Sequence, residues 1–128
     1  MKVDIMTMCD SAQEYNGKLV IVGTFNSLFA KEFPATHSEL AFVARVIFGE
    51  NEKGIHNMEV SIKKNDEDVY IMPVTKMSAD TSSTDGDAII HIILRGNNTV
   101  IPAAGIYKVL LKVDDDVFES DLRAVLKK

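Results

Sequence analysis

Short apolar runs separated by polar turn residues recur along this chain, and they constrain its fold more than any other feature. Residues 39–48 (ELAFVARVIF) and 55–64 (IHNMEVSIKK) place successive side chains on opposite faces, as the two-residue period of a β-strand requires. Residues 106–113 repeat the pattern, with Tyr107 and Val109 on the apolar face. Together with the remaining runs, they predict an all-β antiparallel sandwich of about seven or eight strands.

The segment 17–29 (GKLVIVGTFNSLF) follows Asn16, and the Asn16-Gly17 pair is a strong hairpin signal because both residues tolerate positive φ. We therefore expect the run after the pair to lie antiparallel to a first strand near the N-terminus. Residues 19–22 are apolar without alternation, a pattern typical of a strand buried on both faces or central in its sheet. The other strands are accordingly expected to cover this one.

Three further segments carry expectations of their own. Residues 69–77 have the composition of a strand, but Pro73 cannot donate to a ladder, so this strand is expected at a sheet edge or with a bulge. Residues 88–94 (AIIHIIL) are apolar on both faces apart from His91 and are expected in the interior. The tail from Phe118 to Lys128 fits a strand or a helix, and we favour a strand because an Asp-rich turn precedes it.

Two connections are candidates for contact surfaces. Residues 26–38 carry Phe29 and Phe33 among polar residues, and we expect these aromatic side chains to pack the connection down. Residues 78–87 are rich in Ser, Thr, Asp and Gly and are expected to form a mobile surface loop. Loops positioned by a rigid scaffold often hold binding residues, so both segments are relevant to function.

The size and composition of the chain exclude several classes of protein. Its 128 residues suit a single domain, which we expect to span residues 1–128. The hydrophobic fraction of 46% and the charged fraction of 26% are typical of a globular protein rather than a disordered one. A net charge of -5, with basic residues scattered singly or in pairs, argues against a nucleic-acid partner.

The N-terminal segment indicates in which cellular compartment the protein is expected. Asp4 interrupts its apolar run too early for a secretory signal, and no segment of the chain has the ~18 apolar residues of a membrane span. The single cysteine, Cys9, allows no intramolecular disulfide. We therefore expect a cytoplasmic protein that has no membrane partner.

No residue pattern in the chain predicts catalysis. The three histidines lack the spacing of metal ligands; we expect His91 to be an interior, hydrogen-bonded residue, and His37 and His56 to be exposed. Cys9 lies in a predicted strand, where cysteine is usually a small buried side chain rather than a nucleophile. No glycine-rich phosphate loop is present. We therefore expect no catalytic, cofactor-binding or metal-binding residues, no cofactor and no enzymatic activity.

Several stretches of the chain together resemble a known family. They are residues 16–25 (NGKLVIVGTF), 37–46 (HSELAFVARV) and 102–116 (PAAGIYKVLLKVDDD), with Cys9-Asp10 before the first and Pro102, Gly105 and Tyr107 within the last. The chain resembles an uncharacterised family of small bacterial proteins, a domain of unknown function with an immunoglobulin-like β-sandwich. This resemblance implies a single immunoglobulin-like domain, and it implies no established activity.

Our first hypothesis about function is a non-catalytic binding or structural module. Such a module would contact a protein partner, or a second copy of itself, through the segments 26–38 and 78–87 or through the edge strand 69–77. It is motivated by a clear β framework that carries no pattern for site chemistry. A small-molecule ligand is not indicated.

The alternative hypothesis is a small-molecule or metal-binding protein that uses the acidic loop near Asp85 and Asp87. His91 and Cys9 would be further ligands if the fold brings some of these residues together. Asp85-Gly86-Asp87 superficially resembles a calcium loop, but it lacks the alternate ligand spacing and the closing Glu of an EF-hand. We favour the first hypothesis, because turn residues that accept local hydrogen bonds explain this loop better than a metal site does.

Overall fold

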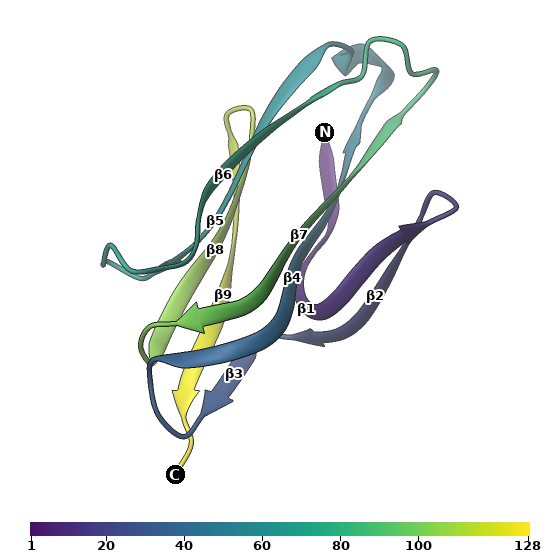
Figure 1. The fold of residues 1–128 in the computed structure, drawn as a ribbon. Helices are drawn as coiled ribbons and strands as arrows, with labels where there is room; N and C mark the ends of the chain where they lie inside the picture. Colours follow the sequence, from purple (N-terminus) through teal and green to yellow (C-terminus); the bar gives the residue numbers. More distant parts are fainter. The chain divides into compact units, whose positions relative to one another are not determined.

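The computed structural model describes residues 1–128, which form two β-sheets (Figure 1). The elements are β1 (Lys2–Tyr15), β2 (Lys18–Phe25), β3 (Ser27–Ala30), β4 (Ala35–Phe48), the 3-10 helix η1 (Glu50–Glu52), β5 (Ile55–Lys64), β6 (Tyr70–Asp80), β7 (Ala88–Ile101), β8 (Gly105–Val113) and β9 (Asp116–Leu126). The predicted all-β class with two sheets, as in a β-sandwich, is confirmed, with nine strands. No helix in the structure has the length and apolar character that a membrane crossing requires.

The chain divides into two compact units, each built around one sheet. The first unit contains the four-stranded sheet, in the order β2-β1-β4-β7, and the second contains the five-stranded sheet, in the order β3-β9-β8-β5-β6. The first unit consists of Met1–Phe25, Glu39–His56 and Ala79–Asn97, and the second of Asn26–Ser38, Asn57–Ser78 and Asn98–Lys128.

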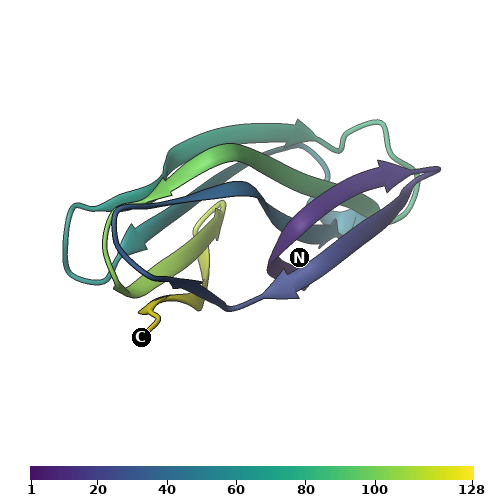
Figure 2. The same cartoon turned by 60° about the horizontal axis from the view of Figure 1, so that its bottom comes forward.

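In the first unit, β1 and β2 form the hairpin that the Asn16-Gly17 pair predicts, drawn in purple and violet in Figure 2. Asn16 and Gly17 have φ angles of 50° and 75°. The prediction that β2 is central or buried on both faces is wrong, because β2 is an edge strand and its Val20 and Val22 are exposed. Valine and isoleucine favour extended backbone at any position of a sheet, so their run predicts a strand without fixing its neighbours.

The strand of this unit that is buried on both faces is β4. Residues 40–44 and Val46 are all buried, as expected when both faces of an alternating strand carry apolar side chains. β4 lies between β1 and β7, whereas β7 is itself an edge strand with Ile89 exposed. The prediction that residues 88–94 lie in the interior is therefore wrong, for the same reason as in β2.

The inner face of the hairpin packs on the core of the first unit. Cys9, Ala12, Ala41 and Val43 form a buried cluster, against which Leu19, Ile21 and Ile93 pack. Two polar contacts join the hairpin to β7. His91 Nδ1 lies 3.0 Å from Glu14 Oε1, and Arg95 donates from Nη2 to the carbonyl oxygen of Ala12 at 2.7 Å. The expectation of a hydrogen-bonded, largely buried His91 is confirmed, since its side chain is 7% exposed.

An ion pair joins β1 to β4 beside an irregularity in β1. Arg45 donates from Nε and Nη2 to the two carboxylate oxygens of Asp4, at 2.9 and 2.8 Å. The register with β4 shifts between Val3 and Ile5, so Asp4 is the extra residue of a bulge. The hydrogen bonds from Arg45 hold the pKa of the Asp4 carboxyl below its ordinary value of 3.8.

We expect this ion pair to make stability depend on pH in the acidic range. Because the pKa of Asp4 is lowered by folding, its contribution is present above the unfolded value and is lost as the pH falls through the folded value. Urea midpoints of the wild type and Asp4→Asn should therefore differ near neutral pH, with the wild type more stable, and converge in acid. A difference that persists unchanged into acid would contradict this role for Asp4.

The second unit has its core on one face of the five-stranded sheet. The buried residues of that face are Met58, Val60 and Ile62 of β5, Tyr107, Val109, Leu111 and Val113 of β8, and Leu122 and Ala124 of β9. The alternation predicted for residues 55–64 and 106–113 is thus confirmed. The tail is a strand, β9, which pairs antiparallel with β8. β6 lies at the edge of the sheet, as Pro73 predicts.

The first residues of the acidic segment 78–87 are fixed by strand pairing and hydrogen bonds. β6 continues to Asp80, and the next residue, Thr81, is buried. The Thr81 N–H donates to the carbonyl oxygen of Gly54 at 2.9 Å, and Asp80 Oδ1 accepts hydrogen bonds from both the N–H and the hydroxyl of Ser82. Part of the segment predicted as a mobile loop is therefore strand or anchored turn.

Candidate functional site

The residues considered for a metal or small-molecule site do not form one. No group of three or more His, Cys, Asp and Glu side chains is placed to hold a metal ion. Asp85 and Asp87 are exposed in their loop, His91 of β7 pairs with Glu14, and Cys9 belongs to the buried cluster under the hairpin. The geometry therefore lends no support to the alternative hypothesis.

Cys9 is a buried structural side chain, as expected. Its Sγ donates to the carbonyl oxygens of Ser11 and Ala41, at 3.4 and 3.7 Å. Burial raises the pKa of this thiol above its ordinary value of 9.0. Because the thiolate is the nucleophilic form, Cys9 is poorly suited to covalent chemistry at neutral pH.

The expectation that His37 and His56 are exposed is wrong, because both are half-buried. The His56 ring stacks on Phe48 with centroids 3.8 Å apart, and its Nε2 lies 2.5 Å from the carbonyl oxygen of Glu52. His37 lines a small pocket. An imidazole can pack its flat face on apolar groups while its nitrogens make hydrogen bonds, so a position beside a turn does not imply exposure.

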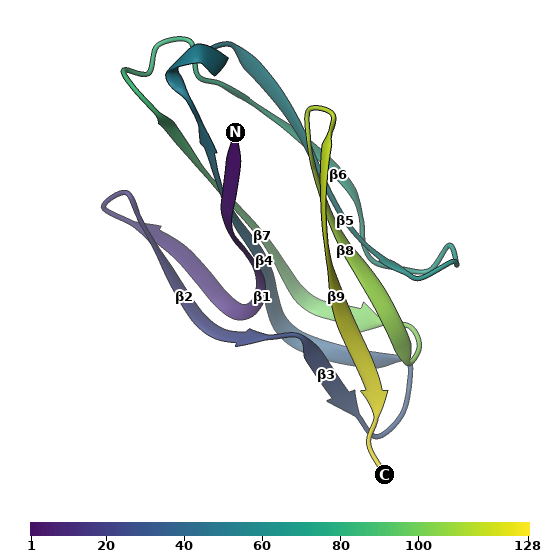
Figure 3. The ribbon, with the colours of Figure 1, turned by 180° about the vertical axis from the view of Figure 1, so that it is seen from behind.

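A different set of residues converges at one edge of the five-stranded sheet, where β3 runs parallel to β9 (Figure 3). Phe29 of β3 is the partner of Val125 in β9, and Arg123 of β9 is the partner of Ile106 in β8. Partner residues share a face, and alternate residues along a strand return to it. Phe29, Val125 and Ile106 therefore lie on one face, opposite to the core, and they are referred to below as the β3 corner.

The β3 corner is apolar and accessible. Phe29 is 66% exposed, Ile106 is 40% exposed, and Val125 is half-buried. Further along the same face, the Lys108 ammonium donates to Asp121 Oδ1 at 2.7 Å, a contact that raises the pKa of Lys108. The same face also carries the apolar residues Leu110 and Val117 farther along β8 and β9. The apolar side chains gathered at the β3 corner are typical of an interaction surface.

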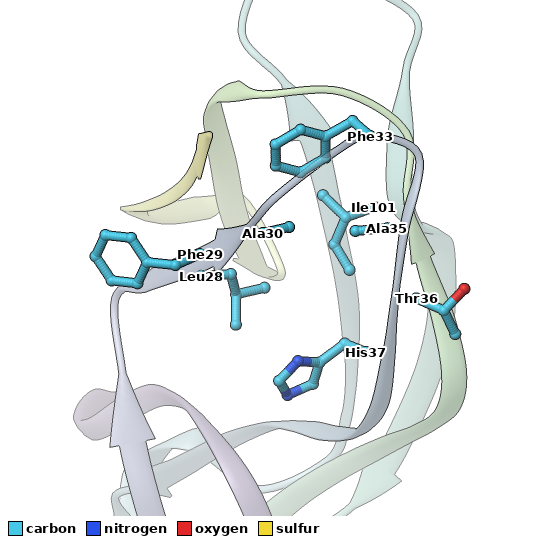
Figure 4. A pocket seen from close by; sticks show the side chains of 8 residues that line it. All are labelled: Leu28, Phe29, Ala30, Phe33, Ala35, Thr36, His37 and Ile101. Carbon is cyan, nitrogen blue, oxygen red and sulfur yellow. The ribbon is translucent and has the colours of Figure 1, made fainter. Parts of the chain in front are cut away.

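A small pocket opens beside β3, with a volume of about 60 Å³ (Figure 4). Its walls are formed by Leu28, Phe29, Ala30, Phe33, Ala35, Thr36, His37 and Ile101. Figure 4 shows Leu28, Phe33 and Ile101 gathered around the cavity, whereas the Phe29 ring points away from them. The prediction that the aromatic residues of segment 26–38 pack it down is therefore right for Phe33 and wrong for Phe29.

Basic side chains flank the β3 corner, although the chain as a whole has a net charge of -5. They are Lys31 after β3, Arg123 within β9, and Lys127 and Lys128 after β9. The Lys127 N–H donates to the carbonyl oxygen of Ala30 at 2.7 Å, so the ends of β3 and β9 lie together. Along the same segments, Glu32 follows Lys31, and Asp121 is paired with Lys108. Basic side chains therefore outnumber unpaired acidic ones at the ends of β3 and β9.

The sequence contained only a weak signal for this site. The triplet Leu28-Phe29-Ala30 is apolar, but it is too short to show the two-residue period of a strand. The sequence therefore predicts these residues as part of a connection rather than as a strand. Ile106 and Val125 lie far from it along the chain, and only the registers of β3, β9 and β8 bring the three side chains together.

Comparison with known proteins identifies a family for this chain. A model of a family described as a family of unknown function, DUF6941, matches residues 4–121. No curated protein and no solved structure matches the chain. The predicted resemblance to an uncharacterised family is thus confirmed over most of the chain, while the immunoglobulin-like topology that it implied stays a prediction.

Proposed function

We propose that this chain, which belongs to the DUF6941 family of unknown function, is a non-catalytic binding module that recognises a protein segment at the β3 corner. The observation that carries the proposal is the convergence of Phe29, Val125 and Ile106 on one accessible face at a sheet edge. Exposed aromatic and aliphatic side chains of this kind form the centres of protein interfaces, where they are desolvated by the partner.

The surroundings of the β3 corner specify the chemistry of the partner. Lys31, Arg123 and Lys127 favour a segment that carries acidic side chains, whereas Phe29 favours an apolar one. β3 is an edge strand, and an extended segment can add to such an edge through main-chain hydrogen bonds. We therefore propose an extended peptide of a partner protein in which an apolar residue is flanked by Asp or Glu.

The pocket beside β3 fits this reading better than a free small ligand. Its volume of about 60 Å³ is far below the roughly 300–1,000 Å³ of ordinary ligand pockets, so it suits at most one side chain of a partner. We further propose a cytoplasmic location for the module, because its free thiol, Cys9, is in keeping with a reducing compartment.

Replacing Phe29 by glutamate should weaken binding of the partner segment at least about tenfold, because it removes the central apolar contact and places a negative charge against an acidic peptide. The measurement is selection of a random displayed peptide library on the immobilised protein, followed by calorimetry with the most enriched peptide. Enriched peptides should combine apolar and acidic residues, and their affinity should fall with added salt.

Val117→Glu provides the matched control, since Val117 is 52% exposed on β9 but lies outside the β3 corner. It introduces the same charge and should leave peptide affinity unchanged. The proposal fails if no peptide is enriched, if enriched peptides are basic, or if Phe29→Glu and Val117→Glu weaken binding equally.

A further inference from the structure

The strand β3 has a strand partner on one side only, because it ends the five-stranded sheet and pairs with β9 alone (Figure 3). The carbonyl oxygens of Asn26 and Ala30 accept hydrogen bonds from backbone N–H groups in and directly after β9, at 2.9 and 2.7 Å. Main-chain groups of successive residues in a strand point to opposite sides, so every second residue from Asn26 to Ala30 faces β9. The main-chain groups of Ser27 and Phe29 therefore face the side that has no strand.

The side chains of β3 also alternate, and one of its faces is the wall of the pocket. Leu28 and Ala30 are half-buried and line the cavity together with Phe33 and Ile101, whereas the Phe29 ring points away from it (Figure 4). A strand added to the open side of β3 would continue the pleat of the sheet. One of its side chains would then lie beside Phe29, and the next would project toward the pocket.

We propose that the partner segment binds as a sixth strand of this sheet, hydrogen-bonded to the main chain of Ser27 and Phe29, with one small apolar side chain in the pocket and the adjacent one on the Phe29 ring. This inference rests on the proposed function of the β3 corner and specifies how the segment is read. A cavity of about 60 Å³ admits roughly four water-sized groups, at about 10–15 Å³ each. Valine and leucine side chains fit this space, and phenylalanine is too large for it.

The charge beside β3 adds an acidic residue to the recognition pattern. Ser27 is the register partner of Arg123, and both share the outer face with Phe29. Arg123 is exposed, and the small Ser27 side chain leaves it accessible from the open side of β3. An added strand lies two strand spacings from β9, roughly 10 Å, which arginine and a carboxylate side chain can span together. We therefore expect Asp or Glu two residues from the residue that contacts Phe29.

The hydrogen-bond pattern can be tested on the peptide that is most enriched from the displayed library. A series of copies of this peptide is made, each N-methylated at one backbone nitrogen, and calorimetry with the full chain measures their affinities. Because only alternate residues of an added strand direct their N–H groups at β3, N-methylation should weaken binding at least about tenfold at alternate positions. Methylation at the positions between them should have a much smaller effect.

The pocket can be tested by enlarging it. The wild type should prefer valine or leucine to phenylalanine at the pocket position of the peptide by at least about tenfold. Leu28→Ala widens the cavity and should reduce or reverse this preference. Leu110→Ala removes the same atoms on the outer face of β8, away from the pocket, and should leave the preference unchanged. If circular dichroism shows that Leu28→Ala is not folded, the N-methylation series with the wild type decides the proposal alone.

The outcomes separate this inference from the proposed function. A peptide that binds the wild type but not Phe29→Glu, and whose N-methylation series has no two-residue period, would overturn strand addition and leave recognition at the β3 corner intact. A size preference that is unchanged in folded Leu28→Ala would likewise overturn the role of the pocket. A library that yields no enriched peptide would overturn both proposals.

Discussion

Replacing Phe42 by alanine is expected to lower the free energy of unfolding by about 3–5 kcal/mol, whereas Phe29→Ala should change it by no more than about 0.5 kcal/mol. Phe42 is fully buried in β4, the strand of the first unit that is covered on both faces, and its removal leaves a cavity. Phe29 is largely exposed in β3, so its removal leaves no cavity. The same chemical change at both positions isolates the effect of burial.

Urea unfolding followed by far-UV circular dichroism measures both effects, and an unchanged slope confirms that the same surface is exposed on unfolding. The comparison also bears on function. If Phe29→Ala proves as costly as Phe42→Ala, Phe29 is part of the packed structure, and loss of peptide binding in Phe29→Glu would then reflect damage to the fold. A stable Phe29→Ala would leave recognition as the reason for an exposed phenylalanine.

The strands whose buried faces could be predicted from sequence are those in which apolar and polar residues alternate along the strand. In β5 and β8 the buried residues Val60 and Val109 alternate with polar neighbours such as Glu59 and Lys108, so both the strand and its buried face follow from the sequence. β4 has apolar residues on both faces and is indeed covered on both. In β4, β5 and β8, the polarity of each side chain therefore indicates whether its face of the strand is buried.

The runs in β2 and β7 carry no such information. Residues 19–22 and 88–94 consist largely of valine, leucine and isoleucine, which favour extended backbone through the shape of their side chains whether or not they are buried. Their sequence therefore predicted strands correctly and placed them wrongly in the interior. Pro73 was more informative about β6, because a missing backbone donor is tolerated only at an edge or a bulge.

The β3 corner could not be predicted from the sequence, because its residues are brought together only by the registers of three strands. Phe29, Ile106 and Val125 belong to three strands, and their common face depends on the parallel register of β3 with β9 and the antiparallel register of β9 with β8. A four-residue strand such as β3 has too few residues for a period to be detected. The sequence names segment 26–38 as a candidate contact surface, and a contact of this segment with a partner stays a proposal.

Replacing Tyr107 is expected to have the second large effect on stability. Its side chain is fully buried in β8, and its hydroxyl donates to the carbonyl oxygen of Ala103 at 2.8 Å and accepts from the Ala103 N–H at 3.3 Å. The ring thus fills the core while the hydroxyl fixes the turn that joins β7 to β8. Tyr107→Ala removes both functions and should lower the free energy of unfolding by about 3–5 kcal/mol.

Tyr107→Phe separates the two functions, because it keeps the ring and removes only the hydroxyl. We expect it to lower the free energy of unfolding by about 1–2 kcal/mol, since two polar groups of Ala103 lose their partner inside the protein. Urea unfolding of both variants measures how much the ring and the hydroxyl each contribute to the free energy of unfolding. No loss in Tyr107→Phe would mean that water satisfies Ala103 equally well, and a loss equal to that of Tyr107→Ala would mean that the hydroxyl, rather than the ring, holds this part of the second unit together.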